Sequence, residues 1–586
     1  MNIALAQMDV KLGQIEANFV KLTELLLEAK AGSAHLVVFP EMCLTGYILG
    51  DKWTDDSFCR RLSAYDQKIR ELSRELDLAI IYGNLFLDTS KTGHDGRKAR
   101  YNAAYCCESG DVQIRFKTLL PSYRVFDDSR YFLSGGADNI APVLLKSGVK
   151  IGLEVCEDMW WEDYGVNVSQ ILIERGAKFI VNISASPFSA GKNTARDNRI
   201  KNIEMIASAS VGFVPFFYLN CTGVQNNGKN IITFDGDSRA YNRKGEKIET
   251  TLKPYEEGII RTRIYEGDVI GEKAALVQNP PIEQKYNAII RAYKGIDEML
   301  GYTPPYIFGL SGGIDSAVSA SLAVLSLGAH RVKGYNLPSK YNTPATKDAA
   351  KQTADSLGIA YKVIPIDKFM EAAAQTLGNL PSAIEENIQA RLRGNILMTL
   401  AAIENGVVVS NANKVETALG YCTLYGDTVG VFSPLGDLTK IEIWEMARFI
   451  NQKNRFIPET LIPDENFRCA VMPSAELKEN QTDPMKWGYH DKLLEAVMNY
   501  KKTGKDDIIS WYEHGILCTK LGISETLFKN YGLNDPKVFA DDLERFMNSM
   551  QKGVFKRLQS PPILILSKSA FGYDFRESQF ACEHLL

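Results

Sequence analysis

The sequence predicts two α/β domains joined by a short linker. In both halves, short apolar strands alternate with amphipathic helices, which is the pattern of sheets covered by helices. The chain has 586 residues, too many for one hydrophobic core. Between about residues 266 and 281 the alternation stops at a stretch that ends in paired prolines. We therefore expect one domain at residues 1–270, a linker at 271–281 and a second domain at 282–586.

The composition describes an ordinary globular protein and narrows its partners. Apolar residues make up 45% of the chain and charged residues 24%. The net charge of -4 argues against a general nucleic-acid binder, which needs a basic excess. The ten cysteines form no Cys-x-x-Cys pair, so we expect no zinc site and a reducing compartment. The first residues resemble a strand, not a signal peptide, and no apolar run reaches membrane-spanning length. We expect a cytoplasmic protein without nucleic-acid or membrane partners.

In the first half, three predicted strands end at residues with reactive side chains. Glu41 follows the second strand, Lys117 follows a later one and Cys156 another. Functional side chains of α/β folds commonly lie at the carboxyl ends of strands. The predicted strands are residues 2–7, 35–39, 112–116 and 150–155, with a helix at 15–30 whose apolar residues have helical spacing.

A carboxylate, an amine and a thiol together can hydrolyse an amide. The carboxylate takes the proton of the thiol, the thiol attacks the carbonyl carbon, and the amine stabilises the oxyanion. Each residue alone has a simpler interpretation, since a strand-end cysteine is commonly a core residue and a single lysine is commonly on the surface. Cys43, Cys59, Cys106 and Cys107 match no catalytic position and are expected to pack in the core.

The words around these residues resemble the nitrilase, or carbon–nitrogen hydrolase, superfamily. They are Val-Phe-Pro-Glu-Met-Cys-Leu-Thr-Gly-Tyr at 38–47, Arg-Phe-Lys-Thr-Leu-Leu-Pro-Ser-Tyr at 115–123 and Gly-Leu-Glu-Val-Cys-Glu-Asp-Met-Trp at 152–160. The resemblance implies an α-β-β-α sandwich in which Cys156 is the nucleophile, Glu41 the general base and Lys117 the stabiliser of the tetrahedral intermediate.

Further matches resemble the glutamine-using members of this superfamily. The stretch at 182–192, Asn-Ile-Ser-Ala-Ser-Pro-Phe-Ser-Ala-Gly-Lys, resembles their substrate loop and points to Ser186 and Lys192. Tyr123 resembles the residue that closes the glutaminase pocket. Val125 stands where some relatives have a glutamate, so a signalling role of that glutamate does not carry over.

The second half begins with a predicted phosphate-binding loop. A strand stops at Gly309, and Ser-Gly-Gly-Ile-Asp-Ser at 311–316 leads into an alanine-rich helix. Such a turn directs backbone N–H groups and a helix N-terminus at one point, which suits phosphate. It lacks the Lys-Ser/Thr of the Walker loop. The alternative is a glycine-rich turn without a ligand. Further strands are predicted at 330–336, 360–366 and 406–410 with a helix at 343–357, which together describe a doubly wound parallel sheet.

On a predicted helix at 386–393, Asn387 and Arg391 lie on one stripe and can face a ligand together. The alternative is a solvated amphipathic face. Asp315 and Glu416 offer oxygen ligands of the type that Mg²⁺ prefers when it is shared with phosphates. Asp315 could instead be a helix N-cap.

The loop resembles that of the ATP pyrophosphatases, and the second half as a whole resembles NAD⁺ synthetases. The resemblance implies Mg²⁺ held by Asp315 and Glu416. Lys340 and Asn411 depart from the usual family residues, which leaves the individual contacts there open. The implied ATP-binding residues are Ser311, Gly312, Gly313, Asp315, Ser316, Asn411 and Lys440, and the implied deamido-NAD⁺-binding residues are Asn387, Arg391, Glu416, Asp427 and Lys556.

With both halves, nearly the whole chain resembles glutamine-dependent NAD⁺ synthetases. The resemblance implies that glutamine supplies ammonia, ATP adenylates the carboxylate of deamido-NAD⁺, and ammonia displaces AMP. It also implies an ammonia tunnel and a homo-oligomer. Three alternatives stay open: another acceptor for the same ATP chemistry, an RNA-modifying pyrophosphatase, which the acidic charge disfavours, and a regulatory module, which would not need all three catalytic groups.

Overall fold

The computed structural model describes residues 1–93, 96–274, 279–378, 380–464, 467–479, 481–499 and 503–572, together with Phe575 and Glu577. It consists of two compact units. The first comprises residues 1–227 and 232–279, and the second comprises residues 228–231 and 280–586. Of the linker predicted at 271–281, residues 275–278 lie outside the described residues. In the described part of the chain, no helix has the length and apolar character needed to cross a membrane.

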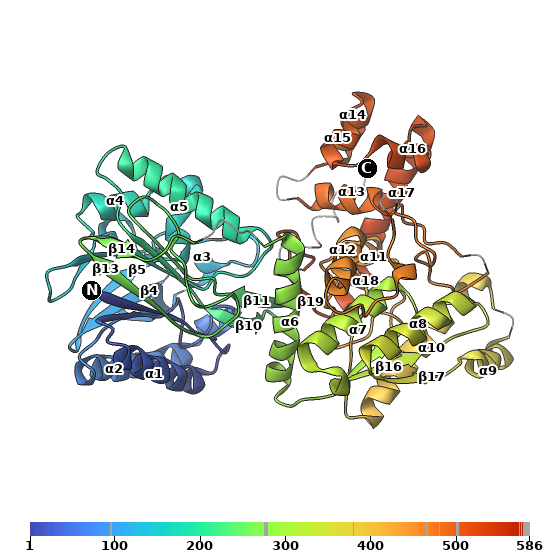
Figure 1. The fold of residues 1–586 in the computed structure, drawn as a ribbon, viewed down its shortest axis with the longest axis horizontal. Helices are drawn as coiled ribbons and strands as arrows, with labels where there is room; N and C mark the ends of the chain where they lie inside the picture. Colours follow the sequence, from blue (N-terminus) through green and yellow to red (C-terminus); the bar gives the residue numbers. More distant parts are fainter. Residues whose placement is uncertain are drawn as a thin grey trace. The chain divides into compact units, whose positions relative to one another are not determined.

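The first unit is a four-layered sandwich of two sheets between two layers of helices. One sheet has seven strands in the order β14-β13-β1-β2-β3-β4-β5, and the other has five in the order β12-β9-β8-β7-β6. Figure 1 shows α1 and α2 on one outer side of this unit and α4 and α5 on the other. The strands of the first sheet are β1 (Asn2–Gln7), β2 (Leu36–Val38), β3 (Ala79–Thr92), β4 (Lys98–Glu108), β5 (Asp111–Phe116), β13 (Gly258–Tyr265) and β14 (Asp268–Ile270). Those of the second are β6 (Val143–Leu144), β7 (Lys150–Val155), β8 (Phe179–Ser184), β9 (Phe216–Asn220) and β12 (Arg239–Tyr241).

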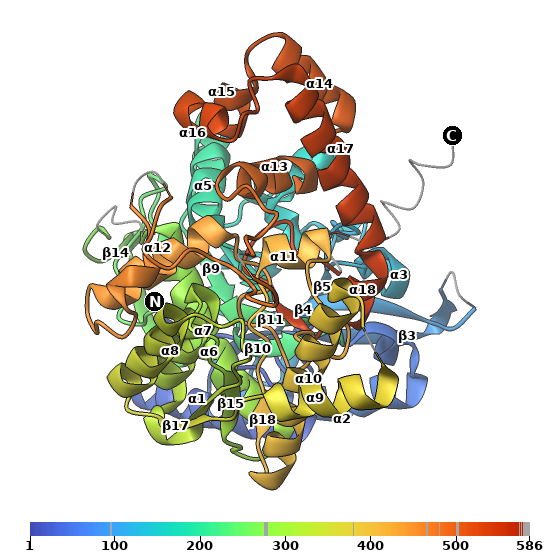
Figure 2. The ribbon, with the colours of Figure 1, turned by 90° about the vertical axis from the view of Figure 1, so that its right-hand side faces the viewer.

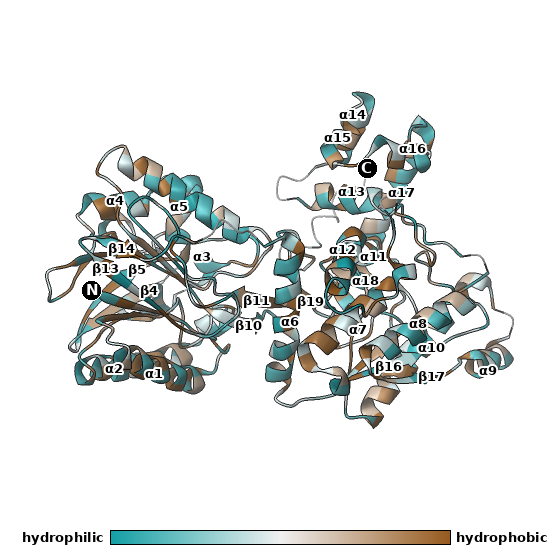
Figure 3. Cartoon of the chain, viewed as in Figure 1, coloured by the Kyte–Doolittle hydropathy of each residue, from teal (hydrophilic) through white to brown (hydrophobic). Residues whose placement is uncertain are grey.

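Apolar side chains from the facing strands form the core between the two sheets. Leu5 and Val38 come from one sheet and Leu153 and Val181 from the other, all within one buried cluster. Figure 3 shows these strands as largely hydrophobic, whereas the outer helices carry both hydrophilic and hydrophobic residues. The outer helices are α1 (Ile15–Ala31), α2 (Asp56–Glu75), α4 (Val168–Glu174) and α5 (Lys192–Ser208). Because the two sheets meet mainly through apolar side chains, a polar group that bonds across them adds a directional link.

The second unit contains a parallel sheet of the order β17-β16-β15-β18. The strand order places β15, which carries the predicted phosphate loop, in the middle of the sheet. The strands are β15 (Tyr306–Gly309), β16 (Val332–Asn336), β17 (Ala360–Val363) and β18 (Val407–Val408). The helices of this part are α6 (Pro281–Leu300), α7 (Ile314–Leu327), α8 (Pro344–Leu357), α9 (Asp367–Leu377), α10 (Ser382–Ile403), α11 (Lys414–Leu419) and α12 (Lys440–Asn451).

Helices and one short strand make up the remaining elements described in the second unit. Figures 1 and 2 both show α14, α15 and α16 grouped beyond α13 and beside α17. The bounds are α13 (Tyr489–Met498), α14 (Lys505–Glu513), α15 (Leu517–Leu521), α16 (Glu525–Asn530), α17 (Pro536–Lys552) and α18 (Val554–Gln559). The strand β19 (Ile563–Leu564) pairs in parallel with Asn230 and Ile231, which is why residues 228–231 belong to this unit.

The predicted fold class is confirmed: a nitrilase-like sandwich is followed by a doubly wound parallel sheet. The strand predicted at 360–366 is shorter in the structure, where β17 ends at Val363. Its partner β16 ends at Asn336, just before Pro338, and proline has no N–H group to continue a ladder. The strand predicted at 406–410 contracts to Val407–Val408.

Candidate active sites

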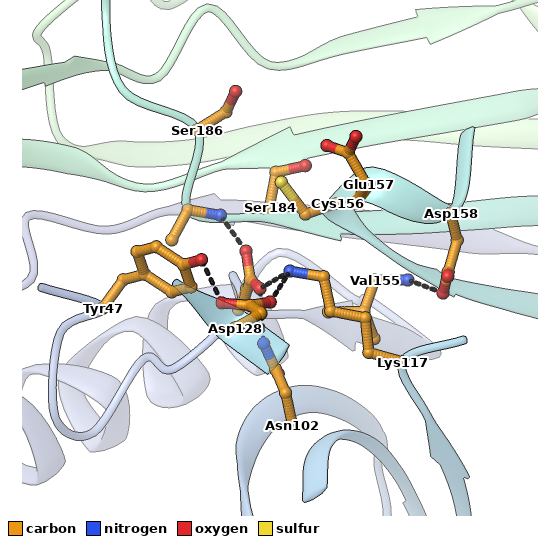
Figure 4. A network of polar contacts seen from close by, with 12 residues as sticks. Tyr47, Asn102, Lys117, Asp128, Val155, Cys156, Glu157, Asp158, Ser184 and Ser186 are labelled. Carbon is orange, nitrogen blue, oxygen red and sulfur yellow. Dashed lines mark hydrogen bonds and ion pairs between the residues drawn. The ribbon is translucent and has the colours of Figure 1, made fainter. Parts of the chain in front are cut away.

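Glu41, Lys117 and Cys156 lie together at the carboxyl ends of strands from both sheets of the first unit. Glu41 follows β2 and Lys117 follows β5 in the seven-stranded sheet, whereas Cys156 follows β7 in the five-stranded sheet. All three side chains are buried. Figure 4 shows the Cys156 sulfur above the Lys117 ammonium group. The sandwich therefore brings the three residues that the sequence singled out into one cluster.

The carboxylate of Glu41 is held in place by three donors. Its Oε1 accepts hydrogen bonds from Lys117 Nζ at 2.9 Å and from Asn102 Nδ2 at 2.6 Å. Its Oε2 accepts from the backbone N–H of Ala185 at 2.7 Å. A buried carboxylate needs such partners, and with them it stays oriented as a proton acceptor.

Lys117 lies between two carboxylates. Its Nζ is 2.9 Å from Glu41 Oε1 and 2.7 Å from Asp128 Oδ2, and Tyr47 donates its hydroxyl proton to Asp128. Burial opposes the charge of Lys117, but Asp128 and Glu41 raise its pKa well above the ordinary value. The ammonium group is therefore present when a negative charge develops on a substrate.

Asp128, Tyr47 and Asn102 were missed by the sequence analysis. Asp128 lies five residues beyond Tyr123, in the α3 turn (Asp128–Tyr131), beside an equally acidic Asp127. Nothing in the sequence separates the two aspartates, because a short turn has no periodicity that shows which side chain points inward.

Cys156 occupies a strained position between β7 and a short 3-10 turn (Cys156–Met159). Its φ is +49°, a left-handed conformation that is unusual for a residue with a side chain. Burial and the charge of Glu41 raise the pKa of the thiol. The group is consequently a neutral thiol beside a carboxylate, so proton removal must accompany attack on the substrate.

The predicted glutamine-binding residues border the same site. The Tyr123 hydroxyl donates to Glu157 Oε1 at 3.0 Å, and Glu157 is the residue that follows Cys156 in the chain. Both peptide groups of Ser186 are held by Asn220, whose Oδ1 accepts from Ser186 N at 2.7 Å and whose Nδ2 donates to Ser186 O at 3.1 Å. Lys192 is the first residue of α5, and burial lowers its pKa to about 8.

The second site is built on the loop between β15 and α7. Ser311 Oγ accepts from Gly313 N at 3.2 Å and lies 3.3 Å from Ser316 Oγ, so the loop folds back on the first turn of α7. Gly313 is the N-cap residue, and Asp315 therefore is not the cap. Gly312 has a φ of +90°, and a Cβ there would lie 1.9 Å from the carbonyl oxygen of Thr346.

A cavity of about 300 Å³ opens beside this loop. Its wall includes backbone and side chains from the ends of β15, β16 and β18 and from α10, which is the usual place for a ligand in an open parallel sheet. Of the predicted residues, its lining contains Ser311, Gly313, Asp315, Ser316, Asn411, Glu416, Asp427 and Lys440.

Lys440 lies among carboxylates at one side of the cavity. Its Nζ is 2.5 Å from Asp315 Oδ2 and 3.4 Å from Glu416 Oε1. Burial, together with the charges of Asp315 and Asp483, raises the pKa of Glu416 to about 7 despite the opposing effect of Lys440. These carboxylates supply the hard oxygen donors that Mg²⁺ prefers. Among the described residues no group of three or more metal-binding side chains is gathered, so the remaining ligands would have to be phosphate oxygens and water.

Four predicted ligand residues lie outside the lining of this cavity, namely Gly312, Asn387, Arg391 and Lys556. Asn387 accepts from Thr423 Oγ1 at 3.1 Å, and Arg391 donates to the carbonyl of Leu424 at 3.3 Å. Lys556 donates to the carbonyl of Cys422 at 2.6 Å, and also to that of Gly420.

The stripe of α10 that faces the cavity is shifted from the one predicted. Arg393 and Gly394 line the cavity, together with Ala390 and Leu397, at helical spacing. Burial lowers the pKa of Arg393 to about 10. Both Arg391 and Arg393 were in the predicted helix, but the sequence could not give the rotation of that helix.

The fold and the two sites define a class of enzyme in which a carbon–nitrogen hydrolase unit is joined to an ATP-using α/β unit. Comparison with known families agrees: residues 2–270 match the carbon-nitrogen hydrolase model and residues 300–516 match the NAD synthase model. The chain is 32% identical to a glutamine-dependent NAD(+) synthetase from Synechocystis, over 98% of this chain and 97% of that protein. It is 30% identical to that of Thermotoga maritima, over 98% of both chains. The chain belongs to the glutamine-dependent NAD(+) synthetase family.

A solved structure agrees with this assignment. The glutamine-dependent NAD⁺ synthetase of Acinetobacter baumannii, determined in complex with ADP, is similar with a TM-score of 0.70 and 26% identity, covering 98% of this chain and 97% of that one.

Proposed function

We propose that the first unit hydrolyses glutamine through a thioester on Cys156. The observation that carries this is the Glu41–Lys117 pair beside the Cys156 thiol. Glu41 takes the thiol proton as sulfur attacks the amide carbon, and Lys117 stabilises the developing oxyanion. The proton passes to the leaving nitrogen, ammonia departs, and water then hydrolyses the thioester.

Three residues are proposed to hold the glutamine. Lys192 provides a partly buried positive charge for the carboxylate of the amino acid, Ser186 presents a fixed loop, and Tyr123 closes the pocket. The support is their position around Cys156: Lys192 interacts electrostatically with the thiol, and Tyr123 is bonded to the adjacent Glu157.

The second unit is proposed to adenylate the nicotinate carboxylate of deamido-NAD⁺ with ATP. The 311–316 loop and the N-terminus of α7 receive the phosphates, and Lys440 adds a positive charge there. Gly312 allows the close approach of the loop to α8, and Asn411, whose Nδ2 donates to Gly309 O at 3.1 Å, fixes the end of β15. Asp315 and Glu416 would hold Mg²⁺, which neutralises phosphate charge when bound. Ammonia then displaces AMP from the adenylate to give NAD⁺.

Deamido-NAD⁺ is proposed to lie toward the 421–427 loop. Asp427 lines the cavity, and burial raises its pKa to about 6. Asn387 and Arg391 bond Thr423 and Leu424 of this loop, and Lys556 bonds Cys422, so their proposed role is to shape the binding surface. From the family we further propose two domains at 1–270 and 282–586, and a homo-oligomeric enzyme of the cytoplasm.

The test is to incubate the purified protein with ATP, Mg²⁺, deamido-NAD⁺ and glutamine, and to measure NAD⁺ and AMP. We expect one AMP for each NAD⁺. Another acceptor in place of deamido-NAD⁺ would be revealed by AMP formation that deamido-NAD⁺ does not stimulate.

The division of labour is tested by Cys156→Ala. This variant should lose glutamine-dependent NAD⁺ synthesis by at least about 10³-fold, because the nucleophile is absent, yet retain synthesis from ammonium chloride. Glutamine-dependent synthesis that survives in Cys156→Ala would contradict the thioester.

A further inference from the structure

The glutaminase residues come from two different sheets, so their spacing depends on how the sheets are joined. Lys117 is fixed to the seven-stranded sheet by its N–H, which donates to Asn102 O of β4 at 2.8 Å, and its carbonyl accepts from Gly135 N of a neighbouring loop at 2.9 Å. Cys156 follows β7 of the five-stranded sheet. Between the sheets the contacts are mainly apolar, and apolar contacts are not directional.

The Asp158 carboxylate bridges the two sheets at this point. Its Oδ1 accepts from the backbone N–H groups of Thr118 at 2.9 Å and Leu119 at 2.8 Å, the two residues after Lys117. Its Oδ2 accepts from the N–H of Val155 at 3.0 Å, the residue before Cys156. Figure 4 shows the bond to Val155 beside Lys117 and Cys156.

We propose that Asp158 is a positioning residue for glutamine hydrolysis, which sets the distance between the Lys117 ammonium group and the Cys156 sulfur. This proposal rests on the glutaminase roles proposed above for Lys117 and Cys156. The Asp158 carboxylate bonds backbone N–H groups, so its proposed effect on the reaction is through Lys117 and Cys156.

The chemistry of the bridge explains why a carboxylate is required there. Asp158 is 2% exposed, and its carboxylate accepts all three of its hydrogen bonds from backbone N–H groups. A carboxylate accepts on both oxygens, whereas an amide accepts on one oxygen and donates from its nitrogen. In Asp158→Asn either the Val155 N–H or the pair of Thr118 and Leu119 would face an NH₂ group, and that side of the bridge would open.

A second directional contact crosses between the sheets at this site. The Ala185 N–H, after β8 in the five-stranded sheet, donates to Glu41 Oε2 at 2.7 Å. Glu41 is thus tied across the sheets by its own carboxylate, whereas Asp158 ties the chain neighbours of Lys117 and Cys156, namely Thr118, Leu119 and Val155.

Asp158→Asn in the full-length enzyme tests the proposal. We expect the glutaminase kcat to fall about 10- to 100-fold, since a displacement near 1 Å between catalytic groups has an effect of that order. The KM for glutamine should stay within about threefold and NAD⁺ synthesis from ammonium chloride within about twofold, because Asp158 bonds neither the glutamine pocket nor the second unit. The matched control is Ser73→Ala, which removes a buried bond to the Leu78 carbonyl far from the site in the same unit.

The rate of alkylation by iodoacetamide separates positioning from general stability. In the described part of the first unit, five further cysteines are buried, namely Cys43, Cys59, Cys106, Cys107 and Cys221. In Asp158→Asn we expect slower alkylation of Cys156, because Lys117 supports its thiolate less well, while the other five stay protected.

Two results would overturn the proposal. One is a kcat and a Cys156 alkylation rate that match wild type. The other is rapid alkylation of all six cysteines, which would show that Asp158 serves the stability of the whole unit. Failure of the proposed glutaminase itself would be recognised separately, since glutamine-dependent synthesis would then survive in Cys156→Ala.

Discussion

Three lysines at the two sites show how neighbouring groups decide the charge of an amine. Lys117 pairs with Glu41 and Asp128, and their charges raise its pKa despite burial. Lys440 likewise pairs with carboxylates, and its pKa is raised although burial opposes this. Lys192 donates to the Pro187 carbonyl at 3.0 Å, and burial lowers its pKa to about 8. Its charge is consequently the one that changes near neutral pH.

This difference predicts the alkaline limb of glutamine use. Lys192 is protonated below pH 8 and loses its charge as the pH rises through its pKa of about 8, so KM for glutamine should rise above that pH. Initial rates from pH 6.5 to 9.5 would measure this. In Lys192→Arg the limb should move to higher pH, because arginine stays charged. A limb at the same pH in the arginine variant would assign it to another group.

The sequence singled out three residues that the structure brings together, but it did not reveal the residues that bond to them. Glu41, Lys117 and Cys156 each follow a strand and stand in distinctive words. Asp128 and Asp158 lie in short turns, where the direction of a side chain follows from the tertiary fold and from no local pattern.

At the scale of elements, both sites use a sharp turn at the carboxyl end of a strand. Cys156 has a φ of +49° after β7, and Gly312 has a φ of +90° after β15. The first turn directs a side chain toward the site, whereas the second directs backbone N–H groups there. Glycine is needed in the second because α8 lies against it, with the Thr346 carbonyl oxygen 1.9 Å from the position of a Cβ.

Gly312→Ala should therefore displace the phosphate loop. We expect NAD⁺ synthesis to fall by about 10²-fold or more with glutamine and with ammonium chloride alike, because the loop must move away from α8. Glutamine hydrolysis, measured as glutamate release, should persist. The matched control is Gly358→Ala, where φ is +65° but no atom lies within 4 Å of the Cβ, so strain occurs without a clash. Equal losses of synthesis in both variants would show that strain alone is responsible.

The presence of the helix α10 could be predicted from the sequence, but its rotation about its own axis could not. The helix itself was expected, but Arg393 faces the cavity and Arg391 bonds the neighbouring loop. Residues 391 and 393 are both arginine, so the hydrophobic pattern of the helix does not show which of them faces the cavity.

At the scale of the molecule, the residues of each site belong to one unit. Glu41, Lys117 and Cys156 lie in the first unit, and the 311–316 loop, Glu416 and Lys440 lie in the second. Chemistry in one unit can therefore be removed without removing the groups of the other. This separation was predictable, because the motifs of the two halves occupy different stretches of the sequence.

A substitution of Asp315, in the second unit, tests whether the two activities can be separated. The carboxylate lies in the first turn of α7, 2.5 Å from Lys440 Nζ, and Glu416 Oε1 lies 3.4 Å from the same amine. If it also holds Mg²⁺, Asp315→Asn removes a metal ligand as well as an ion pair. Asp297→Asn is the matched control, since Asp297 pairs with Arg331 in the same unit and does not line the cavity.

We expect Asp315→Asn to lose NAD⁺ synthesis from either nitrogen source by at least about 10²-fold, while glutamine hydrolysis persists. Raising Mg²⁺ should restore part of the rate if the remaining ligand, Glu416, still binds the ion weakly. Asp297→Asn should keep kcat, although the loss of its ion pair lowers the melting temperature. Near-normal synthesis by Asp315→Asn at every Mg²⁺ concentration would exclude a metal ligand, because asparagine replaces the geometry of aspartate but not its charge. The carboxylate would then serve to hold Lys440 alone, and the phosphates of ATP would be neutralised by the loop and that lysine.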